Sequence, residues 1–398
     1  MSLLEFLGFR PTLPRFAARV LRALPEDEAT GWTFNAEREC LQHPGGTEIS
    51  LRNLFLEYCA SGVFGRPALV RKYADLALTR SHEIPALWVA AVKNIYPVVR
   101  SEFVETTIEI KCRATGATMD SVVLPFAGDL RIRLVYDFGN FVRYVKGEDL
   151  GTWGQSAPDV LGHALANLGR LEKPTWVDSG LGFFSLASPM SYGESMLQLD
   201  SAVAALPFAP NAVFMPCNRG ILLAADGRSE EAMTAMLTEA ARCLREEPWP
   251  VSATLCKRSP DGWQQVDPPA CAAALAHNLF VQHRADYYAG QKEELDALHE
   301  SRGEDVFVAN CSLLGNEDTW QSYCVWTQDV KSLLPVTDWI ALMPQGEDVK
   351  FIRVAWQDVV ETCGPRMLAT TESPPRFLVD SFPTPDEWSA LSSRAITG

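Results

Sequence analysis

Short apolar runs that meet in pairs across turn sequences limit the fold of this chain more than any other feature. Residues 131–136 and 141–145 flank Asp137-Phe138-Gly139-Asn140, a sequence suited to a tight hairpin turn. Two further pairs have the same arrangement, 212–215 with 221–224 and 253–257 with 263–266. Because strands joined by short turns run antiparallel, the sequence predicts several antiparallel hairpins.

Between these hairpins lie segments with the periodicity of amphipathic helices. Val160, Ala164 and Leu168 fall on one face of the first segment, and Met233 and Leu237 on one face of the next. The resulting order is strand pair, helix, strand pair, helix. A parallel α/β sheet would alternate single strands with helices, so we predict an α+β fold in which antiparallel hairpins alternate with packed helices.

Shorter patterns predict the remaining elements of the first two-thirds of the chain. We expect strands at 32–41 and 47–51, joined by a turn at 43–46, and then helices at 51–58 and 69–76. A short apolar strand is expected at 95–100 and a helix at 194–206. Residues 108–112 alternate apolar and polar side chains, which predicts a half-solvated strand.

The sequence changes in character near residue 272. A chain of 398 residues is longer than the usual single domain. Residues 275–301 predict one long acidic helix, and residues 305–382 are again rich in strand patterns. We therefore predict an α+β region over 1–272, opened by an amphipathic helix. The second region, 273–398, is predicted to be an acidic helix followed by a strand-rich module.

The amphipathic pattern near the N-terminus has two interpretations. Leu13, Phe16, Val20 and Leu24 fall on one helical face, with three arginines on the other. An arginine-rich helix of this kind can lie on a membrane surface, so such contact through residues 1–25 is one alternative. The more common outcome is that the apolar stripe packs on the rest of the domain, and we expect this packing.

Net charge and cysteine use restrict the partners and the compartment. The formal net charge is −15, and phosphate backbones are bound by clustered lysines and arginines, so we expect no nucleic-acid partner. The ten cysteines are scattered without a C-x-x-C pair, as free thiols are. No secretory signal opens the chain and no apolar stretch approaches about 18 residues. These features predict a cytoplasmic protein without a transmembrane segment.

No sequence motif identifies a catalytic, cofactor or metal site. Asp137-Phe138-Gly139 matches the kinase metal-binding tripeptide, but H-R-D and the glycine loop are absent and the tripeptide falls at a hairpin tip. The six histidines have neither H-E-x-x-H nor zinc-finger spacing. No G-x-S-x-G elbow or phosphate loop occurs. We therefore expect no cofactor, no metal and no assignable catalytic residue.

Several short blocks nevertheless occur in an order shared with a known family. They are Trp32-Thr33-Phe34; Ile95-Tyr96-Pro97-Val98-Val99-Arg100; Asp137-Phe138-Gly139 with Arg143; Asn167-Leu168 with Leu171; Tyr192 with Ser195; and Pro216 with Arg219, Ile221-Leu222-Leu223 and Asp226. Through these blocks, residues from about 10 to 270 resemble the YtpQ-like family of uncharacterised bacterial proteins. The resemblance implies no activity, cofactor or partner, and it does not cover the chain from about residue 273 onward.

The matched blocks select a set of polar candidates for ligand binding. Arginine suits bidentate recognition of carboxylate or phosphate, and aspartate is its natural counter-ion. If these side chains converge, they form a polar groove able to hold an anionic peptide or a small ligand. The alternative is that they are turn residues and surface ion pairs. The candidates are Arg100, Asp137, Arg143, Asn167, Arg219 and Asp226.

Two functions fit these features. We expect a non-catalytic protein-binding or scaffold role, because no catalytic constellation is complete and two strand-rich regions are predicted. The competing hypothesis is a hydrolase or transferase of unfamiliar type, in which Asp137 or Asp226 works beside an arginine in a cleft. Convergence of the six polar residues on one pocket would favour a ligand site of either kind.

Overall fold

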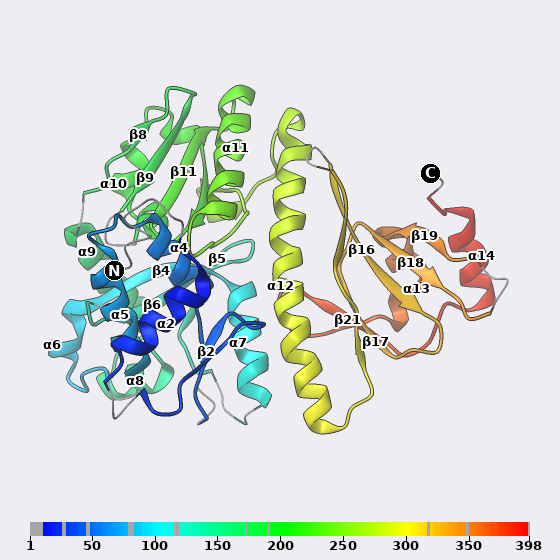
Figure 1. The fold of residues 1–398 in the computed structure, drawn as a ribbon. Coiled ribbons are helices and arrows are strands. Elements are labelled where there is room, and N and C mark those ends of the chain that lie inside the picture. Colours follow the sequence, from blue (N-terminus) through cyan, green and yellow to red (C-terminus); the bar gives the residue numbers. More distant parts are fainter. Residues whose placement is uncertain are drawn as a thin grey trace.

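The chain has an α+β fold, as the sequence predicts. The computed structural model describes residues 11–25, 29–44, 48–78, 83–114, 116, 119–139, 141–171, 173–188, 192–316, 319–346 and 350–396. Its sheets are mostly antiparallel, and helices cover them (Figure 1). None of the helices in these ranges is long and apolar enough to cross a membrane.

The N-terminal part of the chain forms a small unit with its own apolar core. The stripe on the first helix supplies Phe16, Val20 and Leu24, which are buried together with Leu54 and Tyr58. Its elements are α2 (Leu13–Ala23), β1 (Thr33–Asn35), β2 (Cys40–Gln42), β3 (Glu48–Ser50), α4 (Arg52–Ala60) and α5 (Arg66–Leu78). The described part of the N-terminal stripe therefore packs inside the protein, while membrane contact by residues 1–25 is not tested and residues 1–10 lie outside the described ranges.

One predicted strand of this unit is wrong. Residues 32–41 form two strands, because the Oδ1 of Asn35 accepts hydrogen bonds from the main-chain N–H groups of Glu37 and Arg38. This local turn ends β1 and reverses the chain into β2. The two strands form a three-stranded sheet with β3, in the order β1-β2-β3. The turn predicted at 43–46 falls partly outside the described residues.

Two sheets share the central core. The first has the order β4-β6-β5, with β7 paired to β6, and the second has the order β13-β12-β10-β11-β9-β8. Val99 and Leu130 of the first sheet pack in one cluster with Phe214 and Leu222 of the second. The strands are β4 (Ile95–Ser101), β5 (Val123–Ala127), β6 (Leu130–Asp137), β7 (Val142–Tyr144), β8 (Val177–Asp178), β9 (Phe183–Ala187), β10 (Ala212–Asn218), β11 (Ile221–Asp226), β12 (Cys256–Ser259) and β13 (Gly262–Gln265).

Helices cover these two sheets. They are α6 (Trp88–Ala91), α7 (Glu102–Ala114), α8 (Gly147–Trp153), α9 (Ala157–Leu171), α10 (Asp200–Ala204) and α11 (Glu230–Glu246). The predicted hairpins at β6–β7, β10–β11 and β12–β13 are confirmed, and so are the helices at α9 and α11. The predicted helix at 194–206 is instead a 3-10 turn (Gly193–Gln198) followed by α10, since Leu199 between them is extended.

The half-solvated strand predicted at 108–112 is wrong, because these residues belong to α7. Phe103, Thr106 and Ile110 lie on one buried face, at the spacing of a helix. Glutamates in the first turn, and Lys111 and Arg113 in the last, also favour the helix dipole. The alternation over five residues was too short to separate a period of two from one of 3.6.

A long helix, α12 (Ala273–Arg302), lies between the two sheets described so far and the remainder of the chain (Figure 1). It contacts α7 and α11 on one side and β14, β15 and β16 on the other. The predicted long helix and the strand-rich segment after it are confirmed, whereas the division into two regions at residue 272 stays a prediction.

The C-terminal part contains two four-stranded sheets with the orders β14-β17-β21-β20 and β15-β16-β18-β19. Here β14–β17 and β16–β18 are parallel pairs. The elements are β14 (Phe307–Val308), β15 (Ser312–Gly315), β16 (Trp320–Thr327), β17 (Ser332–Pro335), β18 (Trp339–Met343), β19 (Ile352–Ala355), α13 (Trp356–Cys363), β20 (Leu368–Ala369), β21 (Arg376–Val379) and α14 (Pro385–Ser393).

A histidine on α12 with a buried ring nitrogen is expected to make the stability of the chain sensitive to acid. The Nε2 atom of His283 is buried, and it has no hydrogen-bond partner among the described residues. Burial lowers the pKa of His283, although Asp129 and Asp286 oppose the shift. The unfolded chain therefore takes up a proton near pH 6.5 that the folded chain does not. Stability is present above that pH and is lost as the pH falls through it.

We expect the free energy of unfolding of wild type to fall more than that of a His283→Gln variant when the pH is lowered from about 7.5 to about 5.5. The difference between the two proteins should change by at most roughly 1.4 kcal/mol per pH unit. Urea denaturation at the two pH values measures this difference. An equal loss in both proteins would contradict the lowered pKa, because it would show that His283 takes up its proton at the same pH in the folded and the unfolded chain.

Candidate functional site

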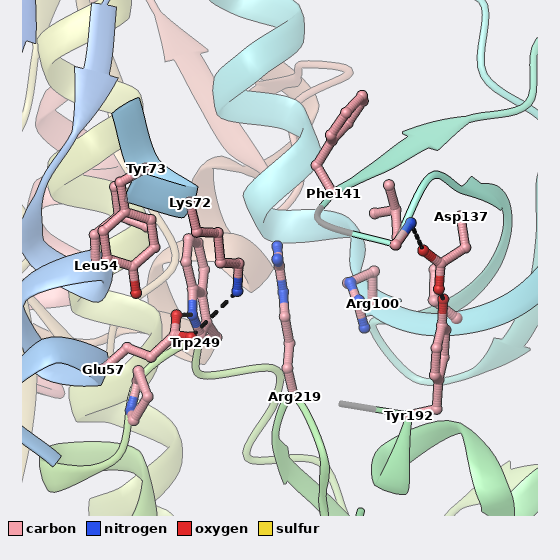
Figure 2. Close-up of a pocket in the computed structure, with 14 residues that line it drawn as sticks. Leu54, Glu57, Lys72, Tyr73, Arg100, Asp137, Phe141, Tyr192, Arg219 and Trp249 are labelled. Carbon is pink, nitrogen blue, oxygen red and sulfur yellow. Dashed lines mark hydrogen bonds and ion pairs between the residues drawn. The ribbon is translucent and has the colours of Figure 1, made fainter. Parts of the chain in front are cut away.

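A cavity of about 390 Å³ opens between the N-terminal unit, strand β4, the β6–β7 hairpin, the β10–β11 turn with the neighbouring Tyr192, and the segment that follows α11. Figure 2 shows Arg219 in the middle of the cavity, with Lys72 and Trp249 on one side and Arg100 and Tyr192 on the other. The charged residues that line it are Glu57, Lys72, Arg100, Asp137 and Arg219. The aromatic ones are Tyr73, Phe141, Tyr192 and Trp249.

Arg219 occupies the middle of this cavity. It follows β10 in the β10–β11 turn, where its main-chain N–H donates to the carbonyl of Trp249 at 2.9 Å. Its guanidinium lies 4.4 Å from the centre of the Trp249 ring, between Lys72 and Arg100 (Figure 2). Burial and the nearby Arg100 lower the pKa of Arg219 to about 10, so the group is still charged at neutral pH.

The guanidinium of Arg219 has no carboxylate within ion-pair distance and no hydrogen bond to the described part of the chain. A half-buried cation usually has such a partner, because removing a charge from water is costly. Arg219 therefore presents unused donors to the cavity, and an anion could supply the missing partner.

Arg100, in contrast, is already paired. It lies on β4 and donates to Oε1 of Glu194 at 2.5 Å and to the carbonyl of Val99 at 2.7 Å. Glu194 is fully buried, and its other oxygen accepts from the main-chain N–H of Gly220 at 2.6 Å. Burial opposes the charge of Arg100, but Glu194 raises the pKa of Arg100 overall. This pair fastens the β10–β11 turn to β4 and so fixes the position of Arg219.

The same turn needs a glycine beside Glu194. A Cβ atom on Gly193 would lie 2.1 Å from the carbonyl oxygen of Gly220, which is closer than any real contact. The chain segment carrying Tyr192 and Glu194 can therefore approach the β10–β11 turn only with glycine at position 193.

Asp137 sits at the tip of the β6–β7 hairpin, and both its oxygens are used. The hydroxyl of Tyr192 donates to Oδ2 at 2.7 Å, and the main-chain N–H of Gly139 donates to Oδ1 at 2.6 Å. Burial and the bond to Asp137 raise the pKa of Tyr192. Asp137 thus holds the hairpin tip against the cavity wall, which accounts for the Asp-Phe-Gly tripeptide without a kinase function.

The opposite wall comes from the N-terminal unit and Trp249. Glu57 accepts from Nζ of Lys72 at 3.3 Å and from Nε1 of Trp249 at 3.4 Å. The main-chain N–H of Trp249 donates to Oδ1 of Asn53 at 2.9 Å, and its φ of 59° is in the left-handed region. Three interactions thus keep the Trp249 ring under Arg219, in a backbone conformation that a tryptophan rarely adopts.

The structure brings together three of the six predicted polar residues. Arg100, Asp137 and Arg219 line the cavity. Asn167 lines a neighbouring hollow, where its Nδ2 donates to the carbonyls of Val92 at 2.7 Å and Ile95 at 2.9 Å.

The other two predicted residues are not among the described lining of the cavity. Arg143 is on β7 opposite Tyr136, and Asp226 ends β11 in an ion pair with Arg228 at 2.8 Å. The single polar groove expected from the sequence is therefore only partly formed.

Sequence reasoning missed residues that complete the site, namely Glu57, Lys72, Glu194 and Trp249. Glu57 and Lys72 lie on two helices of a different unit from Arg219, so no spacing along the chain connects them. Pro248-Trp249-Pro250 has no periodic pattern, although a tryptophan between two prolines is an unusual sequence that could have been noted. Glu194 adjoins the matched Ser195 and could have been included on that ground.

The described lining residues include no His, Cys, Ser or Thr that could act as a nucleophile or a neutral base. Within the described ranges, no group of three or more His, Cys, Asp or Glu residues could hold a metal ion. The arrangement is suited to binding: one unpaired cation, a second cation at the rim and aromatic walls.

No family model, no curated protein and no solved structure matches the chain. The resemblance to the YtpQ-like family therefore stays a prediction.

Proposed function

We propose that the chain is a non-catalytic binding protein that holds an anionic group of a partner protein in the cavity around Arg219. One observation carries the proposal: a charged guanidinium inside a cavity lacks a counter-ion in the described part of the chain. Arginine offers paired donors that match a carboxylate, and such charge-assisted bonds are about twice as strong as neutral ones.

A protein partner fits better than a nucleic acid. The net charge of −15 repels a polyanion along most of the surface, whereas a single carboxylate meets mainly the field of Arg219, since Glu194 and Glu57 offset the charges of Arg100 and Lys72. The aromatic walls also suit the side chains that flank a carboxylate in a peptide. We place this role in the cytoplasm, in keeping with ten cysteines that are all free.

Binding is better supported than catalysis. Asp137 is the carboxylate that the enzyme hypothesis would use as a general base. Both of its oxygens already accept hydrogen bonds, from the Tyr192 hydroxyl and the main-chain N–H of Gly139. Asp226, the other carboxylate considered, pairs with Arg228 away from the described lining of the cavity. Glu57, which also lines the cavity, accepts from Lys72 and Trp249, so the competing hydrolase or transferase hypothesis has no unengaged carboxylate beside Arg219 among the described lining residues.

Replacing Arg219 with methionine is expected to weaken binding of a carboxylate by roughly tenfold to a hundredfold, since a hydrogen bond to a charged group contributes about 1.5–3 kcal/mol. The probe is a short blocked peptide with one glutamate among glycines and serines, and the same peptide with glutamine is its control. Ligand-observed NMR and titration of tryptophan fluorescence measure the affinity of the full chain.

An Arg228→Met variant is the matched control, because it removes an exposed arginine paired with Asp226. It should bind the glutamate peptide as wild type does. The proposal is wrong if wild type does not distinguish glutamate from glutamine, or if Arg219→Met binds both peptides unchanged.

A further inference from the structure

The cavity around Arg219 does not end at Asp137. Asp137 and Gly139 also line a second hollow, together with Asn94, Tyr136 and Phe138. That hollow shares Tyr96 and Leu171 with a third one, lined in addition by Lys93, Asn167 and Arg170. The three hollows are therefore neighbours that share lining residues beside the tip of the β6–β7 hairpin, and we call the three together the groove.

The two ends of the groove are cationic. At the first end lies Arg219, beside the ion pair that Lys72 forms with Glu57, so that Arg219 is the cation there without a carboxylate partner among the described residues. At the far end, Lys93 and Arg170 are exposed, and Arg170 donates to Oδ1 of Asn167 at 2.6 Å. Asn167 is itself held by two main-chain carbonyls, so it positions Arg170. Among the described residues neither Lys93 nor Arg170 has a carboxylate partner.

The middle of the groove is aromatic and carries one negative charge. Tyr96 packs against Tyr192 with ring centres 5.2 Å apart, and Tyr136 packs against Phe138 at 4.6 Å. Asp137 lies where the first two hollows meet. A ligand that follows the groove would thus meet cations, then a carboxylate among aromatic rings, then cations again.

We infer that the groove takes an extended acidic segment of the partner protein, with one carboxylate at Arg219 and a second at Lys93 and Arg170. The residues between these carboxylates are uncharged, because an acidic one passing Asp137 would be repelled. An apolar or aromatic side chain there would pack on Tyr96, which the buried Tyr192 supports from behind. This inference rests on the proposed function and specifies the ligand of the same site.

Blocked peptides with two glutamates separated by two to six uncharged residues, one of them leucine, test this inference. Each residue of an extended chain adds roughly 3.3 Å, so the series measures the separation of the two cationic ends. We expect one spacing to bind at least about tenfold more tightly than the single-glutamate peptide. The same peptide with a third glutamate in the middle should bind more weakly.

Variants separate the two ends of the groove. A Lys93→Met/Arg170→Met double variant should lose the gain from the second glutamate and keep the affinity for the single-glutamate peptide. Arg219→Met should weaken both. Lys173→Met, an exposed lysine close in sequence that is not among the lining residues, is the matched control and should change neither.

The possible failures are distinguishable. If no spacing improves on the single glutamate, or if the gain survives in the Lys93/Arg170 variant, the extended segment is wrong while the Arg219 site stands. If the single-glutamate peptide itself fails to bind, the proposed function is wrong. A ten-nucleotide RNA serves as a competitor. If it displaces the peptides and binds more tightly than all of them, the ligand of the groove is a nucleic acid and the acidic segment is wrong.

Discussion

Replacing Glu194 with glutamine is expected to destabilise the folded chain by about 3 kcal/mol or more, because it leaves a buried guanidinium without its counter-charge. Glu194 is fully buried and joins Arg100 of β4 to the main-chain N–H of Gly220. A glutamine has one acceptor oxygen in place of two, so one of these donors would also lose its partner. The midpoint of urea denaturation measures the loss.

Two further variants make this result specific. Glu148→Gln removes an exposed carboxylate paired with Lys146 and should leave the midpoint almost unchanged. An Arg100→Met/Glu194→Met double variant should recover part of the lost stability, since replacing both members of a buried pair removes the uncompensated charge. A Glu194→Gln protein as stable as wild type would show that Arg100 is solvated or neutralised by another group.

Replacing Arg376 with methionine is expected to have a comparable effect in the C-terminal part, about 3 kcal/mol or more. Arg376 begins β21 and is fully buried. Its guanidinium donates to Oε1 of Gln291 at 3.0 Å and to the carbonyls of Tyr288 at 2.8 Å and Ala309 at 2.9 Å. Methionine would fill much of the same space but could donate to none of these three acceptors, nor to the carbonyl of Leu333, which Arg376 also reaches at 3.3 Å.

The substitution should weaken the contact between α12 and the C-terminal sheets, because Gln291 and Tyr288 are on α12 and Arg376 is on β21. Hydrogen exchange should therefore show faster exchange in β17 and β21 of the Arg376→Met variant. Arg394→Met is the control: it removes an exposed arginine paired with Asp358 and Glu361, and the denaturation midpoint should hardly move. Equal stability of wild type and Arg376→Met would mean that water satisfies the three acceptors.

The secondary structure could be predicted where the hydrophobic pattern was long, or where residues that favour a tight turn separated two apolar runs. The β6–β7 hairpin has its turn residues in the sequence, and α9, α11 and α12 have stripes long enough to fix a period. The strand predicted at 108–112 was wrong because five residues fit either period. The helix that replaces it is stabilised by packing on α12, which lies more than 160 residues further along the chain.

The candidate site could be predicted only in part, because its residues come from distant parts of the chain. Arg100, Asp137 and Arg219 were selected by short matched blocks, and the structure brings these three to one cavity. The same blocks also included Arg143 and Asp226, which have local roles at a strand and a turn. Glu57, Lys72 and Trp249 reach the cavity from two other parts of the fold, and this convergence depends on tertiary packing that no local pattern encodes.

A crystal structure of the full chain with the single-glutamate peptide tests most directly whether Arg219 binds a carboxylate, as we propose. We expect the glutamate carboxylate beside the Arg219 guanidinium, with N···O distances of about 2.8 Å, over the ring of Trp249. A structure in which Arg219 is paired with a carboxylate of its own chain, while the peptide binds elsewhere or not at all, would contradict the claim.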